Sequence, residues 1–191
     1  MTDKGSNKIA WIEAGFQMLS EGGIDSVRVD RISKKIGLTR GSFYWHFKNR
    51  AELLDAMLEL WHQKSTNDII DLIEQEKTNP NNQLSALLNL TTKDTDAKYG
   101  GKFTEMAIRI WSKSSPKAAD IVKQIDLERV KFVNKLLNEM NVEPALASFL
   151  AEIIYNAYIG MASRDLSEEE VTRISKIAGT YIEDQIAQAK L

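Results

Sequence analysis

Apolar residues in the N-terminal part of the chain recur at steps of three and four, and turns that contain glycine divide them into short blocks. The first block runs from Ile9 to Leu19 and ends at Gly22-Gly23, and the second runs from Val29 to Ile36 and ends at Gly37. Steps of three and four place side chains on one face of an α-helix, and glycine readily adopts the left-handed conformation that ends a helix. The segment therefore predicts two helices joined by a tight turn, as in a helix-turn-helix.

Capping residues predict where the next two helices begin. Thr39 is a good N-cap for a third helix that ends near Phe47. Asn49, with Glu52 three positions later, forms a variant of the capping box and begins a long fourth helix that continues towards Glu76. Residues 1–48 are therefore expected to form a three-helix helix-turn-helix domain, and residues 49–191 a second domain.

The second domain also has a helical pattern. Breaks at Pro80, Gly100-Gly101 and Pro116 predict helices at about 82–97, 101–112 and 116–140. Pro144 suits the first turn of a helix that runs to about residue 164, and Ser167 opens the last helix with a capping box. No segment alternates as a strand does. We expect an all-α chain of about nine helices, with an N-terminal helix-turn-helix domain and a C-terminal helical bundle.

Composition narrows the class of protein. Hydrophobic residues make up 43% of the chain and charged residues 27%, which is typical of soluble globular proteins. The absence of cysteine excludes disulfides and thiolate metal sites, and with histidine only at positions 46 and 62 a metal site is not expected. No apolar run approaches the roughly 18 residues of a membrane span, and the N-terminus lacks a signal-peptide pattern. These features predict a cytoplasmic protein without a metal or other cofactor.

The charges are unevenly distributed. The whole chain has a net charge of −2, but residues 1–50 hold nine Lys and Arg against five Asp and Glu. A basic segment on an acidic body is typical of a polyanion-binding head, although chance alone also produces such asymmetry.

Five consecutive ring-bearing residues, Phe43 to Phe47, give the strongest functional signal. Because successive helical residues are rotated by about 100°, one short helix cannot bury all five rings against one core. Phe43 and Phe47 lie four residues apart and are expected to pack beneath the first and fourth helices. Tyr44, Trp45 and His46 then point away from that core, on the helix faces that also carry polar residues one turn earlier. The exposed rings are expected to face DNA.

Residues around these rings have side chains suited to a DNA groove. Arg40 has the fork geometry that guanine requires, and Ser42 can donate or accept a hydrogen bond at a base edge. Gly41 would let the helix backbone approach the groove floor closely. Tyr44 and Lys48 are expected to reach phosphates.

Arg50 is a further cation near these residues and lies in the first turn of the predicted fourth helix. A cation at the positive end of a helix is unfavourable within the protein, and a phosphate bound between the two would explain it.

Residues 9–54 resemble the DNA-binding domain of the tetracycline-repressor (TetR) family of transcriptional regulators. The family motif has a tyrosine, an aromatic residue three positions later, a small N-cap, a base, an acid and a leucine. Its counterparts here are Tyr44, Phe47, Asn49, Arg50, Glu52 and Leu53.

The resemblance implies phosphate contacts for Tyr44 and Arg50 and a place at the margin of the DNA for His46. It implies base-edge positions for Arg40, Gly41, Ser42 and Trp45. The family often has a phosphate-binding Thr where this chain has Val27-Arg28, so Arg28 is expected to replace it. Asp30 stands where many relatives have a base, which argues against base contacts from the second helix.

For the C-terminal domain, the resemblance implies a homodimer formed by the last two long helices and a pocket for a small-molecule effector. The large and small apolar residues of 144–164 independently suit close helix packing, although burial within one protomer would need the same pattern. The candidate pocket residues combine rings with a few polar groups: Trp61, His62, Phe103, Met106, Arg109, Trp111, Tyr155 and Tyr158. The same residues would also fill an ordinary core.

The resulting hypothesis is a dimeric repressor that a small molecule releases from a palindromic DNA operator. An activator or an effector-independent regulator of the same fold is one alternative. A helical protein-interaction adaptor that uses the exposed rings is another. An enzyme is not expected, because the sequence has no nucleophile–base pair, paired carboxylates, phosphate loop or metal cluster.

Overall fold

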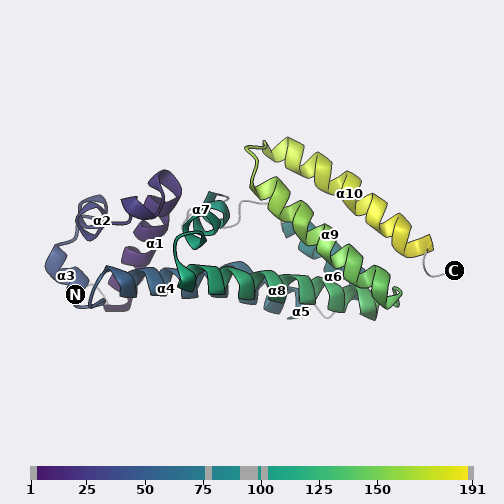
Figure 1. The fold of residues 1–191 in the computed structure, drawn as a ribbon, viewed down its shortest axis with the longest axis horizontal. Coiled ribbons are helices and arrows are strands. Elements are labelled where there is room, and N and C mark those ends of the chain that lie inside the picture. The colour runs from purple at the N-terminus through teal and green to yellow at the C-terminus, as the bar shows by residue number, and fades with distance from the viewer. Residues whose placement is uncertain (1–3, 76–78, 91–98, 100–102, 189–191) are drawn as a thin grey trace. The chain divides into compact units, whose positions relative to one another are not determined.

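The computed structural model describes residues 4–75, 79–90, 99 and 103–188. Within these residues the chain is helical and contains no strand, which confirms the all-α prediction (Figure 1). The contacts divide the chain into two compact units. The first unit comprises Met1–Lys64 and Asp96–Val122, and the second comprises Ser65–Thr95 and Lys123–Leu191.

The first unit contains the predicted helix-turn-helix. Its elements are α1 (Lys4–Gly22), the 3₁₀ turn η1 (Ile24–Ser26), α2 (Val29–Ile36), α3 (Arg40–Tyr44), α4 (Arg50–His62), α7 (Phe103–Ser112) and the beginning of α8 (Pro116–Glu139). The glycines that follow α1 and α2 have positive φ angles, 70° at Gly23 and 68° at Gly37. Both helix ends are therefore where the sequence predicts them, because only glycine adopts this conformation without strain.

The core of the first unit joins the helix-turn-helix to α4. Trp11 and Phe16 of α1, Ile32 of α2, and Leu53 and Met57 of α4 are fully buried. The expected domain boundary after residue 48 therefore differs from the boundary of the compact unit, because α4 packs on α1 and α7 does so as well. The division of functions at residue 48 stays a prediction.

The predicted fourth helix continues through a change in its winding. After α4, residues Gln63–Asn67 form a π turn, and the α-helix resumes as α5 (Asp68–Gln75). Arg129 of α8 holds this turn: its Nε donates to Thr66 Oγ1 over 3.0 Å, and its Nη2 donates to Ser65 O over 3.1 Å. The sequence gives no sign of the π turn, because its partner lies more than sixty residues away.

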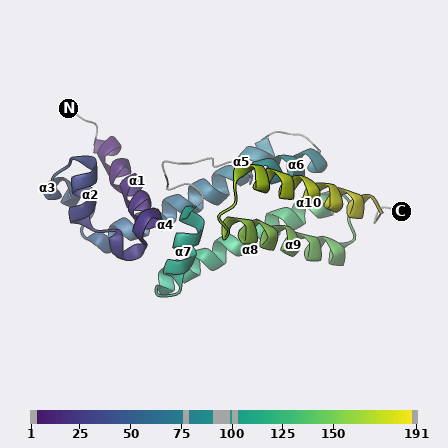
Figure 2. The ribbon, with the colours of Figure 1, turned by 90° about the horizontal axis from the view of Figure 1, so that it is seen from above.

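The second unit is a helical bundle (Figure 2). It contains α5, α6 (Pro80–Leu90), most of α8, α9 (Pro144–Ala162) and α10 (Glu168–Gln188). All five helices contribute to one apolar core, for example through Ile73, Leu84, Leu136, Leu150 and Ile182.

Predicted caps begin the last two helices of this unit. Pro144 is the first residue of α9, and the carboxylate of Glu143 accepts the amides of Ala145 and Leu146. Ser167 and Glu170 form the predicted capping box of α10.

Helix α9 is long and apolar enough to cross a membrane by length and composition alone, contrary to the sequence-based expectation. Only 28% of that window is buried. A single helix of this kind is weak evidence of a span, because core helices of soluble proteins meet the same criterion.

Candidate nucleic-acid interface

Helix α3 begins as its capping residue predicts but is shorter than expected. The Thr39 hydroxyl accepts the backbone N–H of Ser42 over 3.2 Å, which satisfies one free amide of the first turn. The α-helix ends at Tyr44, and a turn continues the chain because the amides of His46 and Phe47 both donate to Phe43 O.

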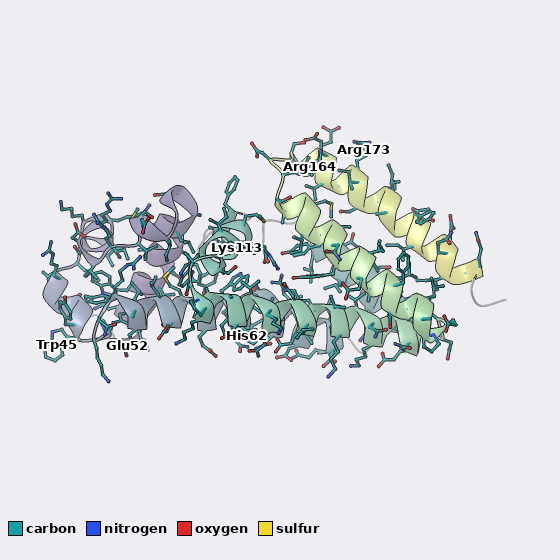
Figure 3. The ribbon with its side chains drawn as sticks, in the orientation of Figure 1. Trp45, Glu52, His62, Lys113, Arg164 and Arg173 are labelled. Atoms are coloured by element: carbon teal, nitrogen blue, oxygen red, sulfur yellow. The ribbon has the colours of Figure 1, made fainter. Side chains whose placement is uncertain are left out.

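The five consecutive rings divide between core and surface as the spacing predicts. Phe43 is completely buried and Phe47 is 2% exposed, with their ring centroids 5.3 Å apart. Tyr44 and Trp45 expose 63% and 77% of their surface, and Trp45 points away from the helices of its unit (Figure 3). His46 is half-buried beside Phe47. The buried pair thus anchors a short segment that presents two large rings outward.

Cationic and small residues surround the exposed rings in the sequence. Thr39, Arg40, Gly41 and Lys48 are exposed, and a Cβ added at Gly41 would meet only Thr39 Oγ1, at 3.6 Å. Arg28, the N-cap of α2, is exposed as well. Because the fold leaves room for a side chain at Gly41, folding does not explain the glycine.

Ser42 does not present its hydroxyl as the base-edge assignment requires. Its Oγ is buried and has no hydrogen-bond partner within the described residues. The hydroxyl therefore points into the protein, and in this conformation it cannot reach a base.

Arg50 also differs from the expectation. Its Nε donates to Val27 O over 2.6 Å, and its Nη2 donates to Ile24 O over 2.5 Å. The argument that this cation lacks a favourable partner within the protein is therefore wrong, because the turn before α2 supplies two carbonyls. The sequence could not show this, since those carbonyls lie 26 and 23 residues earlier in the chain.

The candidate pocket residues are divided between the two units. In the first unit, Phe103, Met106 and Trp111 of α7 line an apolar groove of about 300 Å³ against the end of α1 and η1. Arg109 turns to Glu105, with Nε and Oε1 2.8 Å apart.

Trp61 and His62 are buried on α4 and are not among the groove residues.

In the second unit, the predicted tyrosines belong to a polar cluster between α8 and α9. The Tyr155 hydroxyl donates to Asp126 Oδ1 over 2.5 Å, and the Arg129 guanidinium lies 5.6 Å from the Tyr158 ring centroid. Asp126 and Arg129 were not expected from the sequence, because α8 carries many charged residues and nothing in the sequence distinguishes these two.

Sequence comparison places the helix-turn-helix in a known family. The profile of the bacterial regulatory proteins of the tetR family matches residues 12–57. This segment belongs to the TetR family of DNA-binding domains. The matched segment contains the second half of α1, η1, α2, α3 and the beginning of α4, so this part of the first unit has the sequence pattern of the family's DNA-binding domain. The TetR family is not a family of enzymes, in agreement with the expectation from the sequence.

Individual relatives match over the same part of the chain. Tetracycline repressor protein class D of Escherichia coli is 37% identical over 51 residues, which cover 27% of this chain and 23% of the repressor. The transcriptional regulator AcrR of Shigella flexneri is 32% identical over 77 residues, 40% of this chain and 34% of AcrR. The chain thus matches about a quarter to a third of these TetR-family proteins.

Solved structures extend the likeness of fold to nearly the whole chain. A transcriptional regulator from Aquifex aeolicus VF5 aligns with a TM-score of 0.66 and 21% identity, over 92% of this chain and 98% of its own. A transcriptional regulator from Rhodococcus sp. Rha1 aligns with a TM-score of 0.67 and 16% identity, over 95% of each chain. The helical fold beyond residue 57 is therefore also found in these two solved structures.

Proposed function

We propose that this protein is a dimeric, sequence-specific repressor whose α3 segment reads a palindromic operator and which a small-molecule effector releases. The outward Tyr44 and Trp45 on a short segment anchored by Phe43 and Phe47 carry the proposal. Exposed aromatic rings on an anchored helix-turn-helix suit contact with a duplex groove and its backbone. The proposed DNA contacts are Arg28, Thr39, Arg40, Gly41, Tyr44, Trp45, His46 and Lys48.

Exposed apolar residues on the last two helices support the proposed dimer. Phe149 and Ile153 of α9 are 61% and 48% exposed, and Ile177 and Tyr181 of α10 are 61% and 62% exposed. Large apolar side chains concentrated on two long helices are typical of a protein interface. Two-fold pairing would present two α3 segments to half-sites about 34 Å apart, as palindromes require.

An effector would bind more tightly to the dimer conformation with one spacing of the two α3 segments than to a conformation with another spacing. Such a difference typically amounts to about 1–3 kcal/mol of coupling free energy. The groove lined by Phe103, Met106 and Trp111 supports those residues as ligand contacts, because apolar concavities hold small molecules. Operator affinity should fall when a true effector is added, and unchanged affinity at saturating ligand would exclude the switch.

The DNA-binding part is tested by fluorescence anisotropy with an operator selected from random duplexes. Arg40→Ala should reduce discrimination at one base pair by about 1–3 kcal/mol, because a bidentate contact to guanine is lost. Lys123→Ala, which removes an exposed cation from the second unit, is the matched control and should leave discrimination unchanged. If the Arg40 variant and the wild type discriminated equally between base pairs, Arg40 would not be a base contact.

A protein-interaction adaptor is the second candidate, since the exposed rings alone also suit a protein partner. DNA affinity that falls steeply with salt, with a log–log slope near −0.9 per phosphate contacted, would exclude the adaptor.

A further inference from the structure

Arg50 connects two points of the chain that enclose the whole helix-turn-helix. Its two carbonyl acceptors, Ile24 O and Val27 O, lie just before α2, whereas Arg50 is itself the first residue of α4. Helices α2 and α3 lie between these points in the sequence. The two hydrogen bonds therefore close residues 28–49 into a loop that is fixed at its base.

Buried groups and hydrogen bonds surround the acceptor side of this contact. Val27 is completely buried, and the hydroxyl of Ser26, also buried, lies within hydrogen-bond distance of Met18 O and Gly23 O. Val27 is followed by Arg28, whose carbonyl accepts the first helical amides of α2, from Arg31 and Ile32. A shift of the Val27 carbonyl would therefore move the first turn of α2.

The donor side is fixed as well. The Asn49 side chain accepts the amide of Glu52, and the Glu52 carboxylate accepts the amide of Lys48 over 2.7 Å. These bonds hold the first turn of α4, from which the Arg50 side chain extends. A guanidinium has five N–H donors in a planar fork, and Arg50 directs its Nε edge towards the protein.

We propose that Arg50 is a positioning residue for DNA binding: its guanidinium clamps the two ends of the helix-turn-helix together and so fixes the orientation in which α2 carries α3. The proposal rests on the proposed DNA-binding function. Its contribution to affinity comes from the geometry of the two carbonyl bonds, not from neutralising a phosphate.

Two substitutions of Arg50 separate the effect of hydrogen-bond geometry from the effect of charge. Arg50→Lys keeps the positive charge, but a single ammonium cannot reproduce the planar fork that meets both carbonyls. Arg50→Met removes both charge and donors. Lys48→Met removes an exposed cation two residues earlier and provides the comparison for a lost phosphate contact.

The first measurement is amide hydrogen exchange of the full-length proteins without DNA. Arg50→Lys should speed the exchange of Arg31 and Ile32 about tenfold or more, because charge-assisted hydrogen bonds at the entrance to α2 are lost. Unchanged exchange at these amides would overturn the clamp.

The second measurement is the salt dependence of binding to a selected operator and to a random duplex, at a temperature where circular dichroism shows every variant folded. Lys48→Met should make the log–log slope shallower by about 0.9. Both Arg50 variants should keep the wild-type slope and lose about tenfold or more of operator affinity, with a smaller loss on the random duplex.

Two results would overturn the positioning role. If Arg50→Lys bound the operator with wild-type affinity and Arg50→Met had a shallower log–log salt slope, Arg50 would be a phosphate contact. Wild-type affinity in both folded variants would leave Arg50 only a structural role. If wild type itself bound no duplex, the proposed function would fail, and the hydrogen exchange result would still decide the clamp.

Discussion

Replacing Gly41 by alanine should raise the stability of the protein and lower its affinity for DNA. Gly41 is the second residue of α3, and a Cβ there would meet only Thr39 Oγ1, at the ordinary contact distance of 3.6 Å. Because alanine loses less backbone entropy than glycine in a helix, the free energy of unfolding should rise by about 0.5–1 kcal/mol. For a chain of this size that corresponds to a melting temperature higher by about 1–4 °C.

The same substitution should weaken DNA binding. If the backbone at Gly41 lies against the groove, the added methyl occupies the space of closest approach, and overpacking of this kind costs about 1–3 kcal/mol. Operator affinity should therefore fall by about 5- to 150-fold. Differential scanning fluorimetry measures the first effect, and anisotropy titration with the selected operator measures the second.

Gly37→Ala provides the contrasting variant. Nothing lies within 4 Å of a Cβ built at Gly37, but its φ angle of 68° is unfavourable for alanine, so stability should fall by about 1–2 kcal/mol. A stabilised Gly41→Ala protein with unchanged operator affinity would refute close approach of the α3 backbone to DNA. A destabilised one would show that the site has no room for the methyl group.

Two further predictions concern stability. Gly15→Ala would place a Cβ 2.7 Å from the Sδ of Met57, which is completely buried. Overpacking should therefore lower the free energy of unfolding by about 1–3 kcal/mol, offset by up to about 1 kcal/mol from the higher helix propensity of alanine. A melting temperature above that of the wild type would contradict this prediction. Backbone hydrogen bonds from Ala145 and Leu146 lower the pKa of Glu143 below its ordinary value of 4.5, so its stabilising effect is complete above that pH and is lost as the pH falls through the folded-state pKa. Urea unfolding between pH 3 and 6 should show a weaker loss of stability in Glu143→Gln than in wild type, and identical pH profiles would exclude the effect.

Features that depend on residues three or four positions apart were predictable from the sequence. The caps at Thr39, Asn49 and Ser167 form as predicted because each joins a side chain to an amide three residues later. The burial of Phe43 and Phe47 follows equally from their four-residue spacing. Local geometry determines such contacts, whatever the rest of the fold does.

Features that depend on distant partners were not predictable. The π turn at Gln63–Asn67 has a partner in Arg129, and the Arg50 side chain has its partners before α2. Arg50 differs from the expectation because its unfavourable interaction with the helix dipole is smaller than the gain from two charge-assisted hydrogen bonds. The buried Ser42 hydroxyl was missed for a similar reason: residue type shows that a group can bind DNA but does not show where it points.

The basic character of residues 1–50 overstates the charge available to DNA. Arg50 is bonded to two carbonyls, and Lys35 pairs with Glu21 over 2.7 Å. The other described cations of this segment are exposed: Lys8, Arg28, Arg31, Lys34, Arg40 and Lys48. Each phosphate neutralised contributes about −0.9 to the log–log salt slope, so these six can together contribute at most about −5 per protomer and twice that for a dimer. The net charge of a sequence segment thus sets only an upper limit on its phosphate contacts, and the fold determines how many of those cations remain for the DNA.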